Sequence, residues 1–314
     1  MRVADAIIQG RTCGEAWAGA LTQLLAESDK KLLHLQVQIA EPGVENPAIR
    51  TAVDTLLGGR GLDPVMTVVN TVFPLALAEA SNNPQDLADR YRAMYPRIRS
   101  ERSLNRRGTY FGRMVNHPTD GKPVDQLNRI INRLRTYGHN GNHAATVYEE
   151  STSTAVPEPC DGEPSEASKP EAVSLDEATH GLSMPIVGPR TDSMPLGFPC
   201  LVHISFQHVG DQLHAVAQYR SQYMVQRGYG NYLALGLLQR YIAESAGFRT
   251  GKLTVITGQA EADGRRGDAE QALAGLTQLP LFASTATVTP ISPPRVSSTR
   301  RADPEQLPLL PDQP

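Results

Sequence analysis

The sequence has few cysteines, few aromatic residues and no long uninterrupted apolar run. Its 314 residues include three cysteines, Cys13, Cys160 and Cys200, which lie far apart. A sparse, odd set without a Cys-x-x-Cys pair or a Cys/His cluster argues against a disulfide framework and against a zinc site. We therefore expect a protein with reduced thiols and no bound metal, in the cytoplasm.

Charge of one sign is also not in excess. The formal net charge is -3 and the isoelectric point is near 6.3, so we expect no general nucleic-acid-binding surface, although a local basic pocket is compatible with these values. The opening MRVADAIIQGRTCGEAW has no basic segment followed by an apolar run, as a secretory signal would. Because the apolar stretches end well before membrane-spanning length, we expect no membrane segment.

Composition changes sharply at two places in the chain. Residues 145–181 and 286–314 are rich in Ser, Pro and charged residues and have few large apolar side chains. Such segments bury too little surface to offset the entropy lost on ordering. We predict a disordered insertion at 145–181 and a disordered tail at 286–314, with 1–144 and 182–285 forming the two parts of one domain.

The first part shows both helical and strand patterns. Apolar residues with helical spacing predict a helix over 15–27, and alternation predicts a strand over 32–39 with Leu33 among its inward side chains. The apolar run 63–80 reads as a buried helix interrupted near Pro74. Apolar stripes and flanking Pro and Gly predict an amphipathic helix over 123–137.

The second part is more regular. Alternating residues over 200–209 and 213–219, joined by Gly210-Asp211, predict a β-hairpin. A helix over 232–247, which ends at a glycine, and a strand that begins near 252 follow. We predict an α+β class, with a mixed β-sheet flanked by helices.

Several motifs appear in this second part in a fixed order. FPC at 198–200 begins the hairpin, Arg220-Ser221 ends it, a short loop leads to Asn231, and GQAEAD follows the last strand. In this order and spacing the chain resembles the thymidylate synthase and pyrimidine nucleotide hydroxymethylase family. The resemblance covers about 108–263, since GTYFGRMV and the DQL before the amphipathic helix also match, and it implies the fold of that family.

The resemblance implies a nucleophilic role for Cys200. Carbon 5 of a pyrimidine is a poor nucleophile, but addition of a thiolate to C6 converts the ring into an enolate that attacks a one-carbon electrophile from C5. That step needs an accessible thiolate, which neighbouring arginines stabilise. The alternative is that Cys200 is a small core residue at the start of a strand.

The resemblance also assigns substrate-binding residues. Arg220 and Ser221 would bind the nucleotide phosphate, and the amide of Asn231 would pair with O4 and N3–H of a uracil-type base. The alternatives are a surface pair at a strand end for Arg220 and Ser221, and a helix N-cap for Asn231.

The chain also departs from the family pattern. Glu261 and Asp263 stand where His and Tyr contact the sugar in the family, and would accept hydrogen bonds from sugar hydroxyls as anions. The other departures are Gln259 for Asp in the same motif, and Phe111, Leu201 and Tyr223, which replace Tyr, His and Asp. The family's partner-supplied arginine pair and catalytic Glu have no clear counterpart; the candidates are Arg133, Arg135, Arg190 and Asn70.

Two functional hypotheses follow. The first is a transferase that adds a one-carbon group to C5 of a uracil-type nucleotide; the resemblance implies 5,10-methylenetetrahydrofolate as donor and a homodimer built by stacking two sheets. Val202, Ile204 and Phe206 are candidates for the dimer face or for the core. The second is a catalytically silent relative that binds a nucleotide or a partner. A chance match of an unrelated α/β protein is a third reading.

Overall fold

The computed structural model describes residues 1–101, 105–119, 121–137, 182–188, 192, 199–277 and 287–290. The predicted insertion at 145–181 lies outside the described residues, as does most of the predicted tail at 286–314. Thr287–Pro290 departs from the expected unstructured tail, because these residues form a strand that pairs antiparallel with Ala6–Gly10.

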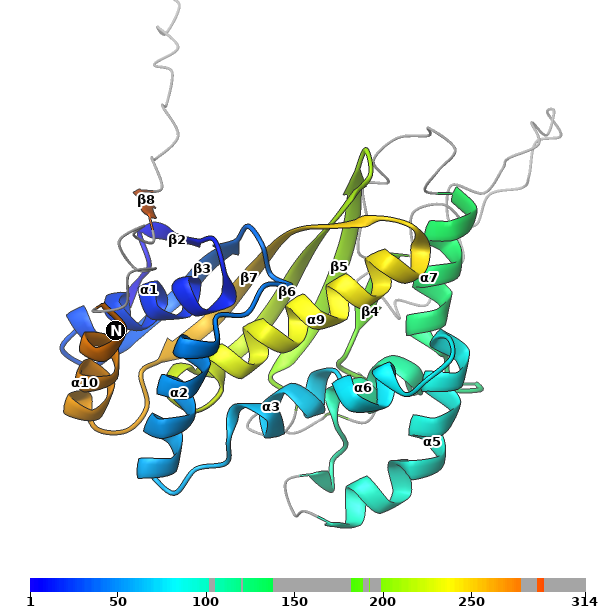
Figure 1. Ribbon diagram of the computed structural model, residues 1–314, viewed down its shortest axis with the longest axis horizontal. Coiled ribbons are helices and arrows are strands. Elements are labelled where there is room, and N and C mark those ends of the chain that lie inside the picture. The colour runs from blue at the N-terminus through cyan, green and yellow to red at the C-terminus, as the bar shows by residue number, and fades with distance from the viewer. Residues whose placement is uncertain are drawn as a thin grey trace, which may run out of the picture.

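The described strands form one mixed, open sheet (Figure 1). Its order is β4-β5-β6-β7-β3-β2-β8, and β1 also pairs with β3. β6 and β7 run parallel, while β5–β6 is an antiparallel hairpin and β3–β7 an antiparallel pair that joins the first part of the chain to the second. The strands are β1 Arg2–Val3, β2 Ala6–Gly10, β3 Lys31–Ile39, β4 Ser183–Pro185, β5 Leu201–Val209, β6 Gln212–Tyr223, β7 Arg249–Glu261 and β8 Thr287–Pro290.

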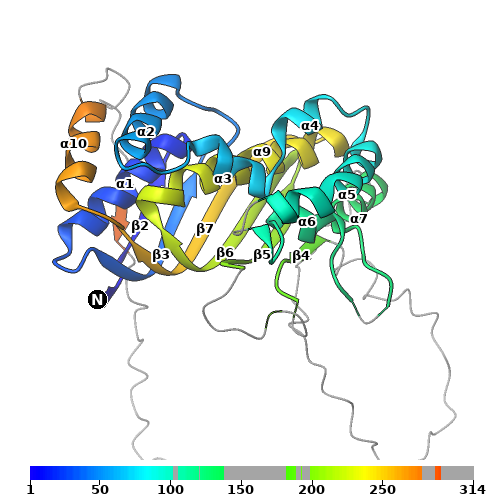
Figure 2. The same ribbon diagram turned by 90° about the horizontal axis from the view of Figure 1, so that it is seen from below.

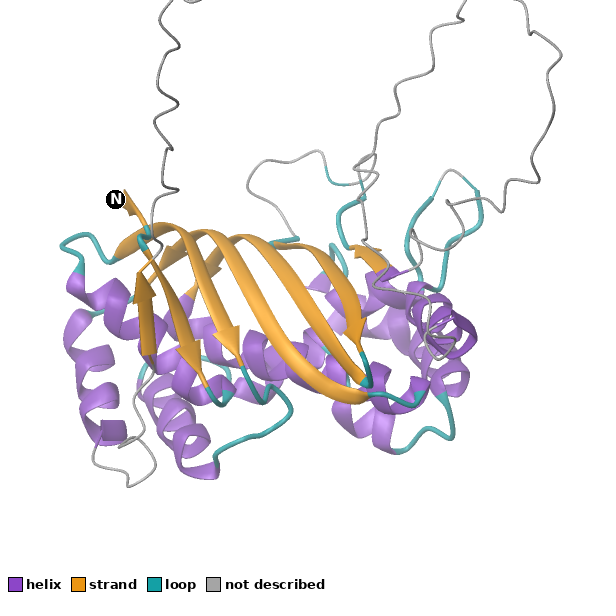
Figure 3. Ribbon diagram, turned by 90° about the horizontal axis from the view of Figure 1, so that it is seen from above, coloured by secondary structure: helices purple, strands orange, loops and turns teal. Residues whose placement is uncertain are grey.

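The described helices gather on one face of this sheet, which leaves the other face uncovered by them (Figures 2 and 3). α9 follows a short π-helix, η3, and packs against α1, α3, β6 and β7. The helical segments are α1 Cys13–Ala26, α2 Pro47–Gly59, α3 Val65–Val72, α4 Leu75–Glu79, α5 Pro84–Glu101, α6 Tyr110–Val115, α7 Gln126–Tyr137, η3 Met224–Gly228, α9 Tyr229–Ala246 and α10 Arg266–Thr277. The predicted α+β class is confirmed.

The core of the sheet is a row of apolar side chains in register across five strands. Because side chains alternate between the faces of a strand, one in-register row faces the helices and the next faces away. The members of the central row are all almost completely buried: Ile8, Val37, Val255, Ala217 and Ile204. Ile204 and Phe206 are therefore core residues, which settles their open assignment against the dimer face.

The uncovered face carries mainly uncharged polar side chains at the adjacent positions. One row crosses four of these strands through Ile7, Gln36, Ile256 and Gln218, all half-buried, and its β5 position is the buried His203. The next row includes Gln9 and Gln38, whose amides lie 3.5 Å apart, followed by Thr254 and Val216. No formally charged side chain interrupts these two rows, so this face differs from an ordinary charged surface.

The alternation slips by one residue at the same level of three neighbouring strands. In β3 every second residue from Ile39 back to Leu35 is buried, but the next buried residue towards the N-terminus is Leu32, three positions away. His34, which lies between Leu32 and Leu35, adopts a positive φ of 55°. The same three-residue step separates Thr257 from Ala260 in β7, and Tyr219 from Gln222 in β6. The slipped positions are aligned across the three strands: Thr257 pairs with Leu35 on one side and with Tyr219 on the other, and Ala260 pairs with Leu32 and with Gln222. Such an irregularity bends a sheet and redirects side chains.

Most of the predicted elements are confirmed, with local corrections. The helix over 15–27, the break at Pro74, the hairpin and the helix that ends before Gly247 all form, and Gly247 adopts the left-handed conformation with a φ of 83°. Leu33 was expected on the buried side of β3, but the slip buries Leu32 instead. α7 begins at Gln126 rather than near Pro123, because the Asp125 carboxylate accepts the backbone N–H of Asn128 and so caps the helix.

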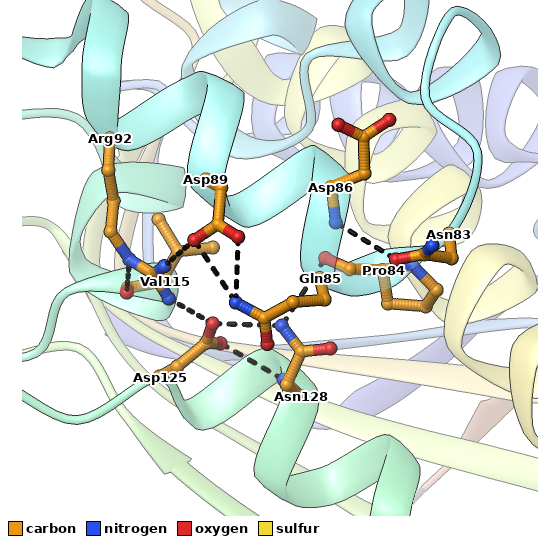
Figure 4. A network of polar contacts seen from close by, with 9 residues as sticks. All are labelled: Asn83, Pro84, Gln85, Asp86, Asp89, Arg92, Val115, Asp125 and Asn128. Atoms are coloured by element: carbon orange, nitrogen blue, oxygen red, sulfur yellow. Dashed lines mark hydrogen bonds and ion pairs between the residues drawn. The ribbon is translucent and has the colours of Figure 1, made fainter.

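A polar network around Arg92 connects α5, α6 and α7 (Figure 4). The Arg92 guanidinium donates to the Val115 carbonyl at the end of α6, at 2.9 Å, and pairs with Asp125. The Asn128 amide donates to Asp125 at 2.8 Å and to the Pro84 carbonyl at 3.3 Å. Because α6 begins at Tyr110, this network fixes the helix that carries a tyrosine of the candidate site.

Candidate functional site

Cys200, Arg220 and Ser221 lie together at the entry to β5. The Cys200 side chain is half-buried, and its Sγ lies 3.6 Å from the Ser221 Oγ. The backbone N–H of Arg220 donates to the Cys200 carbonyl at 2.9 Å. The hairpin register therefore brings together three residues that the sequence motifs separate by about twenty positions.

Tyr110 adds a hydroxyl group to this site. Burial raises its pKa to about 12, and the nearby Cys200 contributes in the same direction. The backbone N–H groups of Leu201 and Cys200 and the guanidinium of Arg227 act the other way, so the phenol lies among these groups. At neutral pH the phenol is protonated and can donate a hydrogen bond to a ligand.

Phe111 stands where the resemblance leads us to expect a tyrosine, and Tyr110 supplies a hydroxyl beside Cys200 in its place. Phe111 is fully buried and packs edge-on against Phe73 and Tyr91, with ring centroids 6.1 and 4.7 Å apart. The preceding residue, Tyr110, takes the position beside the thiol. Tyr110 supplies the hydroxyl because it is the first residue of α6 and lies at the start of β5.

Two buried polar groups of β6, on residues that flank Arg220 and Ser221, have no hydrogen-bond partner among the described residues. They are the Tyr219 hydroxyl and the Gln222 Nε2, on side chains that are 3% and 4% exposed. Burial raises the pKa of Tyr219 well above its usual range, and Tyr110, Tyr232 and Cys200 add to this effect. Unpaired buried polar groups cost about 1–3 kcal/mol each, so they are typical of places where a ligand or water completes the structure.

Asn231 is not a helix cap. α9 begins at Tyr229 and its N-cap position is Gly228, which makes Asn231 the third helical residue. The residue is 4% exposed, and the structure shows no hydrogen bond from its side-chain amide to the described part of the chain. The alternative interpretation of Asn231 as a capping residue is therefore wrong.

The π-helix η3 at Met224–Gly228 precedes α9 and was not expected from the sequence. The Trp17 indole donates to the Met224 carbonyl at 2.8 Å, and an Asp263 oxygen accepts the N–H groups of Val225 and Gln226 at 2.9 and 3.2 Å. Segments of π-helix often occur at functional sites. The sequence carries no signal for this one, because the groups that hold it come from α1 and from the end of β7.

Glu261 and Asp263 are engaged in other contacts. Glu261 forms an ion pair with Lys31, at 3.1 Å. Asp263 receives the two η3 N–H groups through one oxygen, while its other oxygen lies 3.8 Å from the Arg60 guanidinium. Both carboxylates thus have structural partners, unlike the Tyr219 hydroxyl and the Gln222 Nε2.

Four further candidates are described, and each of them lies in other surroundings. Asn70 is exposed on α3, and the Arg135 side chain donates to the Ser245 carbonyl near the end of α9, at 2.8 Å. Leu201 is fully buried in the core, and Tyr223 is 52% exposed at the end of β6. Phe198 and Arg190 lie outside the described residues.

Comparison of the chain with protein-family models and with curated proteins gave no match. Within the described ranges, no group of three or more His, Cys, Asp or Glu side chains is placed to hold a metal ion. None of the helices in that part of the chain is long and apolar enough to cross a membrane.

Proposed function

We propose that this protein has a thymidylate-synthase-like fold, binds a uracil-type pyrimidine nucleotide and adds a one-carbon group to its C5 through a Cys200 adduct at C6. The observation that carries the proposal is the half-buried Cys200 thiol, whose Sγ lies 3.6 Å from the Ser221 hydroxyl oxygen. The backbone carbonyl of Cys200 also accepts a hydrogen bond from the backbone N–H of Arg220. A nucleophile, a hydroxyl and a guanidinium-bearing residue are thereby combined at one strand entry.

The proposed chemistry proceeds through covalent addition. The Cys200 thiolate forms a C–S bond to C6, and the electron pair of the C5–C6 double bond moves to C5 and O4. The side chain of Asn231 would hold the O4 and N3–H edge, with its N–H facing the developing negative charge on O4. C5 then takes up a proton or a one-carbon electrophile. Loss of the original hydrogen from C5 and departure of the thiolate from C6 restore the ring.

The described residues do not fit a folate well. A pterin presents adjacent N–H donors, which a carboxylate would accept. Glu261 and Asp263, the carboxylates that the resemblance assigns to the site, both have other partners, while the exposed Tyr223 stands where the family has Asp. No step is therefore derived through the cofactor, and 5,10-methylenetetrahydrofolate enters only as one arm of the test.

We also propose a homodimer that forms through the uncovered face of the sheet. The row of Ile7, Gln36, Ile256 and Gln218 and the row of Gln9, Gln38, Thr254 and Val216 carry no formal charge, and the described helices leave this face uncovered (Figure 3). A second copy would cover this face with the same rows, which glutamine side chains can bridge by amide pairing. Sedimentation at micromolar concentration is the test, and a monomer would refute this assembly.

The second candidate function is a catalytically silent protein that binds a nucleotide or a partner. It is favoured by the ion pairs of Glu261 with Lys31 and of Asp263 with Arg60, which occupy the carboxylates expected to contact a sugar. A protein of this kind would bind a pyrimidine nucleotide without reaction at C5.

The deciding experiment is incubation with C5-tritiated uridylate and cytidylate, in ribo and deoxy forms, with and without methylenetetrahydrofolate. Tritium release without the folate reports addition at C6 and exchange at C5, whatever product follows. Release that depends on the folate identifies a one-carbon transfer. Binding of a nucleotide without any release would replace the first function by the second.

A further inference from the structure

Arg113 and Asp192 form a buried ion pair between α6 and the part of the chain that leads to Cys200. The Arg113 guanidinium donates to both carboxylate oxygens of Asp192, at 2.8 and 2.7 Å, and the two side chains are 10% and 7% exposed. A buried pair is often no more stabilising than apolar residues of similar volume, because both charges lose their hydration. A bidentate pair does, however, fix the direction and the distance between its two groups. Its main effect is therefore on geometry.

The Asp192 carboxylate also holds the edge segment, residues 183–188, which consists of β4 and the three residues after it. One Asp192 oxygen accepts the backbone N–H of Gly188 at 2.7 Å. The backbone N–H of Asp192 donates to the Gly188 carbonyl at 2.9 Å, which closes a turn. The end of the edge segment is thereby attached to Arg113 and so to α6.

Gln126 of α7 attaches the edge segment at a second point. Its side chain is 6% exposed, and its amide donates to the Arg113 carbonyl at 3.1 Å and to the Pro185 carbonyl at 2.9 Å. α6 is itself held by the contacts of Arg92 with the Val115 carbonyl and with α7. The edge segment is thus attached to a helix whose position other contacts already fix.

The start of β5, next to the edge segment, is irregular. The register of β5 against β6 shifts by one residue between Leu201 and His203, so Val202 is an extra residue in β5. Bulges of this kind bend a strand and redirect its side chains, and they are frequent next to active sites. Because Cys200 lies two residues before the extra one, regular pairing with β6 does not by itself set the direction of its side chain.

The edge segment holds the extra residue from the side opposite to β6. The backbone N–H groups of Ile186 and Val187 both donate to the Val202 carbonyl, at 2.9 and 3.4 Å. Val187 directly precedes Gly188, the residue that the Asp192 carboxylate holds. A continuous series of contacts therefore runs from the buried ion pair to the bulge in β5.

We propose that Arg113 and Asp192 are positioning residues: their ion pair holds the edge segment against the bulge and thereby directs the Cys200 thiol toward Ser221. On the β6 side, the backbone N–H of Arg220 bonds to the Cys200 carbonyl, and the edge segment supplies the second fixed point on the other side of β5. The inference rests on the Cys200 site of the proposed function but not on chemistry at C5.

The test compares the rates at which neutral iodoacetamide alkylates Cys200 and Cys13, measured by mass spectrometry of the two peptides. Cys13 is buried in α1, where its thiol donates to the Pro42 carbonyl, so its alkylation reports opening of the fold. Arg113→Lys keeps the positive charge but loses the bidentate geometry. Release of the edge segment should raise the rate at Cys200 about three- to tenfold and leave the rate at Cys13 unchanged.

The matched control is Arg50→Lys in α2. The Arg50 guanidinium also donates to two carboxylates, those of Glu45 and Asp54, at 2.9 and 2.7 Å. The same substitution therefore breaks the same kind of contact in a part of the chain that does not hold the edge segment. The rate at Cys200 should stay at its wild-type value.

The double variant Arg113→Met/Asp192→Leu separates positioning from stability. It leaves no unpaired charge in the interior, so urea unfolding should be close to that of the wild type. The apolar pair has no fork and no acceptor for the Gly188 N–H, so Cys200 should still be alkylated faster than in the wild type. A purely structural role of the ion pair would instead restore stability and the Cys200 rate together.

An unchanged Cys200 rate in Arg113→Lys would overturn the inference. An equal rise at Cys13, an equal rise in Arg50→Lys or a wild-type Cys200 rate in the double variant would overturn it as well. Where the wild type releases tritium, Arg113→Lys should lower kcat and leave KM for the nucleotide unchanged, because the ion pair touches no ligand.

The alkylation rates and the tritium release fail independently. A faster Cys200 in Arg113→Lys, without tritium release by the wild type, would keep the positioning role and remove the proposed reaction. Tritium release by the wild type, with an unchanged Cys200 rate in Arg113→Lys, would keep the reaction and remove the positioning role.

Discussion

Two groups of polar side chains, one around Cys200 and one at the end of β7, differ in whether they have hydrogen-bond or ion-pair partners. In the thiol region, formed by Cys200 and the β6 residues Tyr219, Ser221 and Gln222, two buried polar atoms lack partners among the described residues. In the carboxylate region, formed by Lys31, Arg60, Glu261 and Asp263, both carboxylates are paired. The thiol region therefore has the capacity to bind a ligand, whereas the carboxylate region stabilises the fold.

Replacement of the thiol is the strongest test of this contrast. Cys200→Ala should abolish tritium exchange and covalent trapping by a 5-fluoropyrimidine nucleotide, because no adduct can form at C6. The fold should survive, since loss of one half-buried thiol costs about 1–2 kcal/mol of unfolding free energy. Exchange assays and urea unfolding measure the two effects. Undiminished exchange in Cys200→Ala would remove Cys200 from the mechanism.

Arg220→Ala should weaken nucleotide binding. Loss of a charged hydrogen-bonding group costs about 1.5–3 kcal/mol, or roughly ten- to a hundredfold in affinity. Calorimetry with uridylate and uridine provides a matched control, since the nucleoside has no phosphate and should lose little. Equal losses for both ligands would show that Arg220 does not contact the phosphate.

Asn231→Asp should change the preferred base and leave the phosphate contact intact. A carboxylate would face the acceptor O4 of uracil but would accept from the amine of cytosine. Such a mismatch costs about 1–3 kcal/mol, which shifts the ratio of uridylate to cytidylate affinity by roughly ten- to a hundredfold. An unchanged ratio would mean that Asn231 does not read the base.

In the carboxylate region the main effect should be on stability. Asp263→Ala removes the acceptor of the Val225 and Gln226 N–H groups and should lower the unfolding free energy by about 1–3 kcal/mol. Asp263→Asn keeps one oxygen acceptor and should lose less. If Asp263→Asn instead lost nucleotide affinity at unchanged stability, the carboxylate would be a ligand contact, and the contrast between the regions would fail.

The smallest effect is expected for Glu261→Gln. Its ion pair with Lys31 joins two partly exposed side chains, 27% and 36% exposed, and pairs of this kind contribute about 0–1 kcal/mol. We expect nearly unchanged urea unfolding and nearly unchanged affinity for ribo and deoxy nucleotides. A selective loss of ribonucleotide binding would instead assign Glu261 to the sugar.

The sequence allowed more of the fold to be predicted than of the site. Alternation in 201–209 and 212–219 is a local property of the chain, and the turn at Gly210 fixes the register from Val209 back to His203. An irregularity between Leu201 and His203 then shifts the pairing by one residue and brings Cys200 opposite Arg220, which local alternation does not predict. The role of Asn231 was open because a cap and an interior helical residue differ by only a few positions. The π-helix decided between them, and it depends on contacts with Trp17 and Asp263.

The amino-acid sequence by itself determined the strands, the main helices and the order in which Cys200, Arg220, Ser221 and Asn231 follow one another, because periodicity and turn residues act over short distances along the chain. Only the tertiary structure decided that Leu32 rather than Leu33 is buried, that Tyr110 rather than Phe111 reaches the thiol, and that Glu261 and Asp263 are paired. These outcomes depend on the aligned slip of β3, β7 and β6 and on helices packed from distant segments, so no local pattern encodes them.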